Sequence, residues 1–154
     1  MTGALLFQKK LIKKEMNMTE YEKNYKGKSA LLVDDDADFL DLITFYLESY
    51  GFNVITGTSQ AEGEELINKE KFDIAVFDLM MENADSGFIL SYKLKNKYPD
   101  IPVIIATSVT NETGLHFDAS TEEMRSWIKA DTIMNKDIRI EQLRSEIDKL
   151  LDNK

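Results

Sequence analysis

Apolar residues from position 29 onward follow two alternating patterns. Short apolar runs, typical of buried strands, lie at 29–33, 52–56, 72–77, 102–106 and 132–134. Around them, apolar residues return every three or four positions, which predicts one-sided helices at about 39–50, 59–69, 87–97 and 140–150. Strands that alternate with helices favour right-handed crossovers and a mostly parallel sheet covered on both faces. We therefore expect a doubly wound α/β domain with five strands.

Local signals mark the ends of several expected helices. Gly51 follows the first periodic stretch and is expected to stop that helix. Ser59 and Glu62 have the spacing of a capping box. Asp36 or Asp38 is expected to cap the helix that follows the first strand.

Composition narrows the class of protein. The 154 residues are 43% hydrophobic and 31% charged, which suits one globular domain and argues against disorder. Cysteine is absent and His116 is the single histidine, which excludes disulfides, thiolate metal sites and multi-histidine sites. No apolar run reaches the roughly 20 residues of a membrane span, and no signal-peptide cleavage pattern is present. We expect a cytoplasmic protein.

Charge is distributed unevenly along the chain. Residues 1–28 carry seven lysines and three glutamates, whereas residues 29–154 carry 12 basic and 25 acidic side chains. We expect a basic N-terminal extension at 1–28 and an acidic globular domain at 29–154. The overall charge of −9 weighs against nucleic-acid binding.

Two interpretations of the extension stand. It forms a basic amphipathic helix that contacts a membrane surface or a partner, or it has no such role. In the second case it is a frayed, solvated leader, or it follows an upstream start codon and the true start is Met16 or Met18. We favour the second, because charge runs at chain ends are usually solvated.

The segment Ser108–Ala130 separates the fourth and fifth strands without a clear helical period. Residues 120–123 could cap a short helix that runs to Trp127. Connections of this length are usually functional or mobile. We expect Trp127 to anchor the segment to the domain.

Polar residues follow the strands where each one ends. The ends carry Asp34-Asp35-Asp36, Asp78, Thr107-Ser108 and Asn135-Lys136. Each alone has a purely structural interpretation: a turn with a helix cap, a polar loop start, a strand end, or a solvated lysine. Ligands of open parallel sheets bind beyond these carboxyl ends. In a doubly wound sheet the residues converge on one rim.

The combination predicts a cation site for a phosphoryl group. Two carboxylates about 4 Å apart repel by roughly 4 kcal/mol at an effective dielectric of 20, so Asp34, Asp35 and Asp78 together need a cation to stay ionised. Oxygen ligands alone favour Mg²⁺. A hydroxyl (Thr107) and an ammonium (Lys136) beside that ion suit phosphoryl oxygens.

Four motifs in order resemble the receiver domain of two-component response regulators. They are Leu31–Asp36, Phe72–Met81, Thr107 and Lys136, with 43 residues from Asp35 to Asp78 and 29 from Asp78 to Thr107. The resemblance covers nearly all of 29–152 and implies a flavodoxin-like sheet in the order 2-1-3-4-5.

The resemblance also implies the role of each site residue. Asp78 would be the phosphoacceptor that attacks a phosphohistidine on a sensor histidine kinase or phosphotransfer protein. Mg²⁺ would be bound by Asp35, by Asp34 through water, by Asp78 and by the Met80 carbonyl. Thr107 and Lys136 would bind the phosphoryl group. The chain would thus be a signalling domain, not an enzyme beyond its own phosphorylation and dephosphorylation.

Departures from the family pattern concern the output surface. Glu82 and Asp137 each stand where the family usually has proline. Because Asp137 follows the lysine, the cis-proline turn that usually orients Lys136 is not expected. Ile133 occupies a switch position that often carries Tyr or Phe. The usual fourth helix is not evident between Thr107 and Lys136.

Three functions are compatible with these residues. The first is a stand-alone receiver phosphorylated on Asp78; because no output domain follows residue 154, we expect an effector protein in trans. The second is a pseudo-receiver that binds partners independently of phosphorylation. The third, a phosphohydrolase, is disfavoured because Met80 stands where such enzymes place a second acid. The sequence leaves open whether the chain forms a homodimer.

Overall fold

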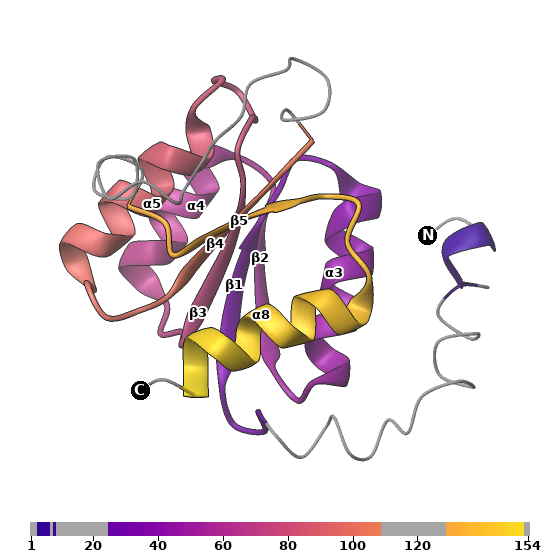
Figure 1. The fold of residues 1–154 in the computed structure, drawn as a ribbon. Coiled ribbons are helices and arrows are strands. Elements are labelled where there is room, and N and C mark those ends of the chain that lie inside the picture. Colours follow the sequence, from indigo (N-terminus) through magenta and orange to yellow (C-terminus); the bar gives the residue numbers. More distant parts are fainter. Residues whose placement is uncertain (1–2, 7, 9–24, 109–128, 153–154) are drawn as a thin grey trace.

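A computed structural model describes residues 3–6, 8, 25–108 and 129–152 of the chain. Five parallel strands alternate with helices (Figure 1). The strands are β1 (Ser29–Val33), β2 (Asn53–Gly57), β3 (Ile74–Asp78), β4 (Val103–Thr107) and β5 (Thr132–Asn135). The helices that alternate with these strands among the described residues are α3 (Ala37–Ser49), α4 (Gln60–Lys69), α5 (Ser86–Lys97) and α8 (Ile140–Asp152).

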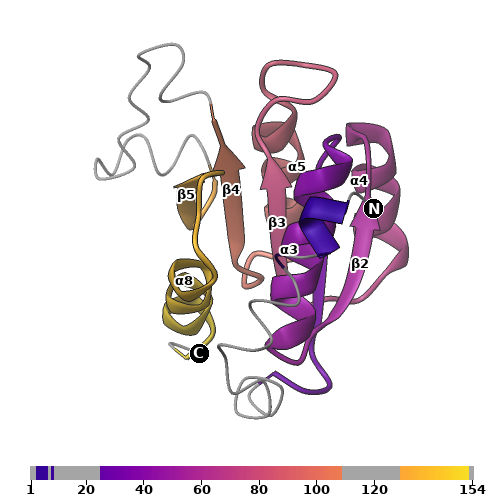
Figure 2. The same ribbon diagram turned by 90° about the vertical axis from the view of Figure 1, so that its right-hand side faces the viewer.

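The sheet order is β2-β1-β3-β4-β5, which confirms the expected doubly wound topology. In Figure 2, β5 lies at one edge of the sheet and β2 at the other. β3 lies in the middle, and all five of its residues are buried. The expected third strand, 72–77, lies too early. The side chain of Phe72 is buried outside the strand, while the backbone of Asp78 still pairs with Ala106.

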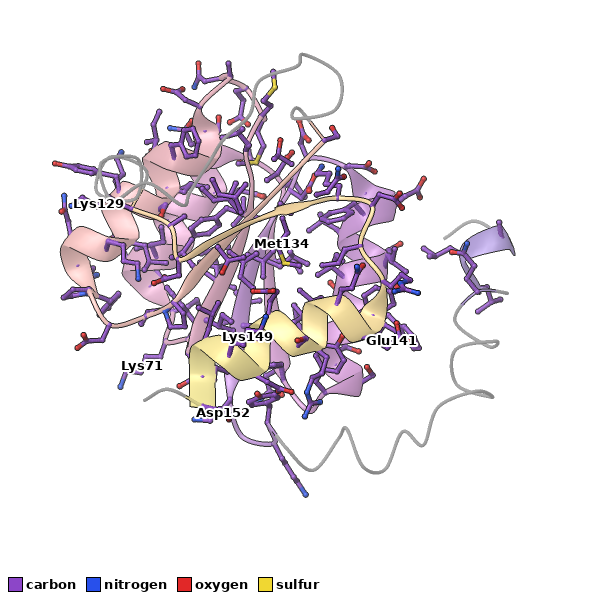
Figure 3. The ribbon with its side chains drawn as sticks, in the orientation of Figure 1. Lys71, Lys129, Met134, Glu141, Lys149 and Asp152 are labelled. Atoms are coloured by element: carbon purple, nitrogen blue, oxygen red, sulfur yellow. The ribbon has the colours of Figure 1, made fainter. Side chains whose placement is uncertain are left out.

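Alternate strand residues feed two hydrophobic cores, one on each face. Leu32, Val76 and Ile104 join the core under α3 and α8, whereas Leu31, Phe77 and Ile105 join the core under α4 and α5. Both faces are therefore covered, as the continuous apolar runs predicted. Met134 of β5, labelled in Figure 3, packs against the α3/α8 core.

The expected helix ends are largely confirmed. Asp36 caps α3 by accepting hydrogen bonds from the Asp38 and Phe39 N–H groups. Gly51 follows that helix with φ 109°, a left-handed conformation that favours glycine. Ser59 caps α4, but the Glu62 carboxylate accepts from the N–H of Thr58 instead of closing the full capping box on Ser59.

The chain ahead of β1 already packs with the domain. The Tyr25 ring stacks on Phe52 with centroids 4.7 Å apart, and its hydroxyl donates to Asp148 of α8. The guanidinium carbon of Arg144 lies 4.9 Å from the Tyr25 ring centroid. The division at residue 28 stays a prediction, with Tyr25 on the folded side of any boundary.

Several expectations fall outside the described residues. They concern residues 9–24 of the extension, and His116, Trp127 and the short helix within 109–128. Among the described residues, no helix has the length and apolar character needed to cross a bilayer.

Candidate functional site

The carboxyl ends of β1 and β3 bring three acids together. One carboxylate oxygen from each of Asp34, Asp35 and Asp78 lies within 4.8 Å of the others. Asp34 and Asp78 are 0% and 5% exposed, whereas Asp35 is exposed. The expected acidic cluster is therefore present, with two buried carboxylates and one that faces solvent.

Strand geometry explains why Asp34 and Asp78 face each other. β1 pairs directly with β3, so their ends are adjacent. Asp34 continues the side-chain parity of Leu32, and Asp78 that of Val76, so both side chains lie toward α3 and α8. The Asp34 Oδ1 atom also accepts from the Asp36 N–H at 2.8 Å, which fixes the turn that presents Asp35.

Lys136 reaches this cluster from the end of β5. Its Nζ atom lies 2.9 Å from Asp34 Oδ2 and 3.3 Å from Asp78 Oδ1. The ammonium also lies 4.7 Å from the centroid of the Phe39 ring. The lysine therefore bridges the two buried acids, although Asp137 follows it in place of proline.

Burial and like charge control protonation in the cluster. Burial, followed by the negative charge of Asp34, raises the pKa of Asp78 to about 7. Burial also raises the pKa of Asp34, against the effect of Lys136. Burial disfavours the Lys136 ammonium, but Asp34 and Asp78 outweigh it and raise the lysine pKa. Without a further cation, the cluster therefore resists full ionisation.

The residues fit a divalent ion. Three carboxylates and one ammonium carry a net charge of −2 when all are ionised. All the side-chain donors are oxygens, which is the set that Mg²⁺ prefers. Asp34, Asp35 and Asp78 would hold the ion, and the fit rests on their proximity and uncompensated charge.

Thr107 and Met80 lie at or just beyond the carboxyl ends of β4 and β3. Thr107 is 1% exposed and stands one residue beyond Ala106, the register partner of Asp78. Its carbonyl accepts from the Lys136 N–H at 3.1 Å, which joins the ends of β4 and β5. Met80 follows β3 and is 44% exposed. Ile133, at the position where the resemblance implies a switch residue, packs against the α4/α5 core.

Three contacts at the site were not anticipated from the sequence. Gly87 of α5 approaches so closely that an added Cβ would lie 2.5 Å from the Asp78 carbonyl oxygen. Phe39 supports the lysine ammonium, and Asn135 closes the turn that contains Lys136. An Asn at a strand end is a known signal for such a turn. The positions of Gly87 and Phe39 depend on helix packing, which local sequence does not encode.

Comparisons with known proteins agree with this geometry. A family model described as the response regulator receiver domain matches residues 30–148. The heme response regulator HssR of Staphylococcus aureus (strain MRSA252) is 35% identical over 114 residues, covering 73% of this chain and 46% of HssR. The transcriptional regulatory protein GlrR of Escherichia coli K12 is 40% identical over 85 residues, covering 55% of this chain and 19% of GlrR. The chain thus spans half or less of these curated relatives.

Solved structures show the same fold. A CheY-like receiver domain protein from Methanospirillum hungatei JF-1 superposes with a TM-score of 0.69 at 25% identity, covering 82% of this chain and 94% of that one. The response regulator protein TrrA from Thermotoga maritima, in complex with Mg²⁺ and BeF, gives a TM-score of 0.65 at 22% identity, covering 80% and 99%. The matched family model, the sheet order and the acid cluster agree, and the chain belongs to the response regulator receiver domain family.

Proposed function

We propose that this chain is a phosphoacceptor in two-component or phosphorelay signalling, with Asp78 as the phosphorylated residue. The observation that carries the proposal is the meeting of Asp34, Asp35 and Asp78 within 4.8 Å, with Lys136 ion-paired to Asp34 and Asp78. Asp78 is the candidate nucleophile because it ends the central strand and is paired with Lys136. Asp35, which is exposed, is the better placed to bind a metal from solvent.

In the proposed phosphoryl transfer, each side chain of the site has one role. An ionised Asp78 oxygen attacks the phosphorus of a phosphohistidine whose other ring nitrogen carries a proton. The phosphorus–nitrogen bond breaks, its electron pair stays on the ring, and neutral imidazole leaves. Lys136 donates to a phosphoryl oxygen while it stays next to Asp78, and the Thr107 hydroxyl donates to another.

The chemistry that Mg²⁺ supplies when bound is positive charge, which keeps the carboxylates ionised and offsets the charge of the phosphoryl oxygens. Asp34, Asp35, Asp78 and the Met80 carbonyl are the proposed ligands. Because these groups lie on two adjacent strand ends, the ion site and the nucleophile are built by the same part of the sheet.

The proposed partners are a sensor histidine kinase or phosphotransfer protein as donor and an effector protein as receiver of the signal, in the cytoplasm. The domain as proposed modifies only itself. Ile133 in place of an aromatic switch residue implies that any signal from Thr107 reaches the effector through a different contact.

The test is to incubate the protein with acetyl phosphate, or with BeF₃⁻, in the presence of Mg²⁺. We expect one adduct per chain, detected by intact mass for phosphate and by fluorine NMR for BeF₃⁻. Asp78→Asn should abolish both signals. Asp100→Asn, which removes an exposed carboxylate far along the chain from the cluster, is the matched control and should keep them. A wild-type chain with neither an adduct nor Mg²⁺ affinity contradicts the proposal.

A pseudo-receiver is the second candidate, motivated by Asp137 in place of proline. The ion pairs of Lys136 argue against it, because the lysine reaches both acids without that proline. Partner binding that is unchanged by both acetyl phosphate and Asp78→Ala would favour the pseudo-receiver.

A further inference from the structure

The turn that contains Lys136 has a support of its own. The Lys136 N–H donates to the Thr107 carbonyl at 3.1 Å, so the backbone is tied to β4 up to this residue. The next N–H, that of Asp137, donates to the Asn135 Oδ1 atom at 3.0 Å. No peptide bond among the described residues is cis. The chain therefore turns over the side chain of Asn135, without a proline.

This hydrogen bond encloses the backbone of the lysine. Its acceptor belongs to the residue before Lys136 and its donor to the residue after it. A turn of this type replaces a backbone hydrogen bond with a side-chain one and restricts the dihedral angles of the residue in between. Asn135 therefore limits the directions in which the Lys136 side chain can leave the strand.

The turn after β1, on the other side of the site, has the same type of hydrogen bond. The Asp34 Oδ1 atom accepts from the Asp36 N–H at 2.8 Å and so encloses Asp35. In both turns the side chain of one residue accepts from the backbone N–H two residues later. The residue enclosed between them is Asp35 in one turn and Lys136 in the other. Asp34 does this while also pairing with Lys136.

The far end of the lysine is limited by Phe39. This ring is nearly buried on α3 and lies 4.7 Å from the ammonium, within the range of a cation–π contact. Asp36, the cap of α3, accepts from the Phe39 N–H and fixes where that ring begins. The lysine is thus restrained at its backbone by Asn135 and at its tip by Phe39 and the two acids.

We infer that Asn135 is a positioning residue for Lys136: its side-chain amide holds the turn that aims the ammonium at Asp78. This inference rests on the proposed function of Asp78 and Lys136. It adds a residue that contacts neither the phosphoryl group nor the metal and that acts on the transfer only through the lysine.

The test compares Asn135→Ala with two matched variants. Asn135→Asp keeps an acceptor oxygen at the same position. Asp137→Ala changes the exposed neighbour but keeps the backbone N–H that makes the bond. Unfolding curves are measured first, to check that all three variants fold. Because Asn135 lies on an edge strand and is only partly buried, we expect cooperative unfolding for each.

The first measurement needs neither metal nor phosphodonor. In the unphosphorylated, Mg²⁺-free protein, the side-chain ammonium of Lys136 should give a proton–nitrogen NMR signal, since its ion pairs slow exchange with water. We expect Asn135→Ala to lose that signal, and Asn135→Asp and Asp137→Ala to keep it. A signal that persists in Asn135→Ala overturns the inference, even if the wild type is phosphorylated normally.

The second measurement separates positioning from metal binding. With saturating Mg²⁺ and acetyl phosphate, Asn135→Ala should slow phosphorylation about 10- to 100-fold, the loss that a displacement of roughly 1 Å can cause. Its Kd for Mg²⁺, measured by calorimetry, should change by less than about twofold, because Asn135 is not a ligand. An equal loss in Asp137→Ala would show a merely sensitive loop and overturn the inference.

A double variant tests the same hydrogen bond from its donor side. Asp137→Pro removes the N–H that Asn135 accepts, so in that background Asn135→Ala should have little further effect on the phosphorylation rate. A full additional loss in that background would mean that Asn135 acts by another route. Absence of phosphorylation in the wild type would instead contradict the proposed function, and the ammonium signal would still decide the role of Asn135.

Discussion

The two strands that lead to Asp78 and Lys136 are held in different ways. β3 lies in the middle of the sheet with every residue buried, and it ends at Asp78. β5 lies at the edge with every residue only partly buried, and Lys136 follows it. Asp78, the proposed nucleophile, is therefore fixed by the core, whereas the lysine needs local contacts from Asn135, Phe39 and the acids. Perturbing the core and perturbing these contacts should have separable effects.

The largest expected effect comes from truncating a fully buried residue of the sheet. Ile105 of β4 is fully buried and is the register partner of Ile133 on β5, which is partly buried. Ile105→Ala should lower the free energy of unfolding by about 2–5 kcal/mol. Ile133→Ala should cost clearly less, because less apolar surface is lost from the core. Urea unfolding measures both, and equal losses would contradict the contrast.

The next effect concerns the end of β3. In Gly87→Ala, the new Cβ would lie 2.5 Å from the Asp78 carbonyl oxygen and 2.8 Å from Leu79 Cα, so backbone must move. We expect a loss of about 1–3 kcal/mol in unfolding free energy and weaker Mg²⁺ binding. Gly63→Ala is the control, since the three atoms nearest its Cβ are side-chain atoms of Leu90 and Val33, at 3.0–3.3 Å, and not backbone atoms. A Gly87→Ala protein as stable as Gly63→Ala would show that α5 can shift.

The pH dependence of stability tests the buried acid. The pKa of Asp78 is about 7 in the folded chain, mainly through burial, which is above the value of about 3.9 for an unfolded chain. Its contribution is therefore fully present below about pH 4 and is lost as the pH rises through 7, on the order of 1 kcal/mol for each pH unit between those two values. In Mg²⁺-free buffer, unfolding free energy should fall over this window in the wild type and less in Asp78→Asn. Parallel curves for the two proteins would place the titration elsewhere.

The smallest effect is expected at the tip of the lysine. Phe39→Leu removes the ring beneath the ammonium and should weaken its restraint by about 0.5–1 kcal/mol. The phosphorylation rate should fall by only a few fold, because Asp34 and Asp78 still pair with Lys136. Leu42→Ala, on the same helix, controls for packing and should not change the rate. A loss as large as that of Asn135→Ala would make the ring, and not the turn, the main support.

Much of the fold could be predicted from the sequence, because burial on both faces of a parallel sheet requires apolar runs. The predicted strand ends were less accurate, because the hydrogen bonds that pair strands are made by the backbone and do not depend on side-chain polarity. Asp78, Thr107 and Asn135 pair as strand residues although their side chains are polar. The acids and Lys136 were predictable because parallel strands present their carboxyl ends on one rim.

Other features depend on contacts between distant segments. The packing of Tyr25 on Phe52 and α8 could not be expected, because charge alone suggested that the chain before β1 is solvated. The close approach of Gly87 depends on how α5 lies on β3. Asn135 carried a weak local signal, but its meaning depended on the lysine next to it.

The Tyr25 contacts indicate where a label or a fused module can be attached. Tyr25 binds Asp148 near the end of α8 and stacks beside the amino ends of the strands, whereas the reacting groups lie at the carboxyl ends. A fluorophore or fused module joined just before Tyr25 and another joined after Asp152 would sit near each other, on the side of the sheet remote from Asp78. Such a pair of labels would report whether Tyr25 stays packed against α8.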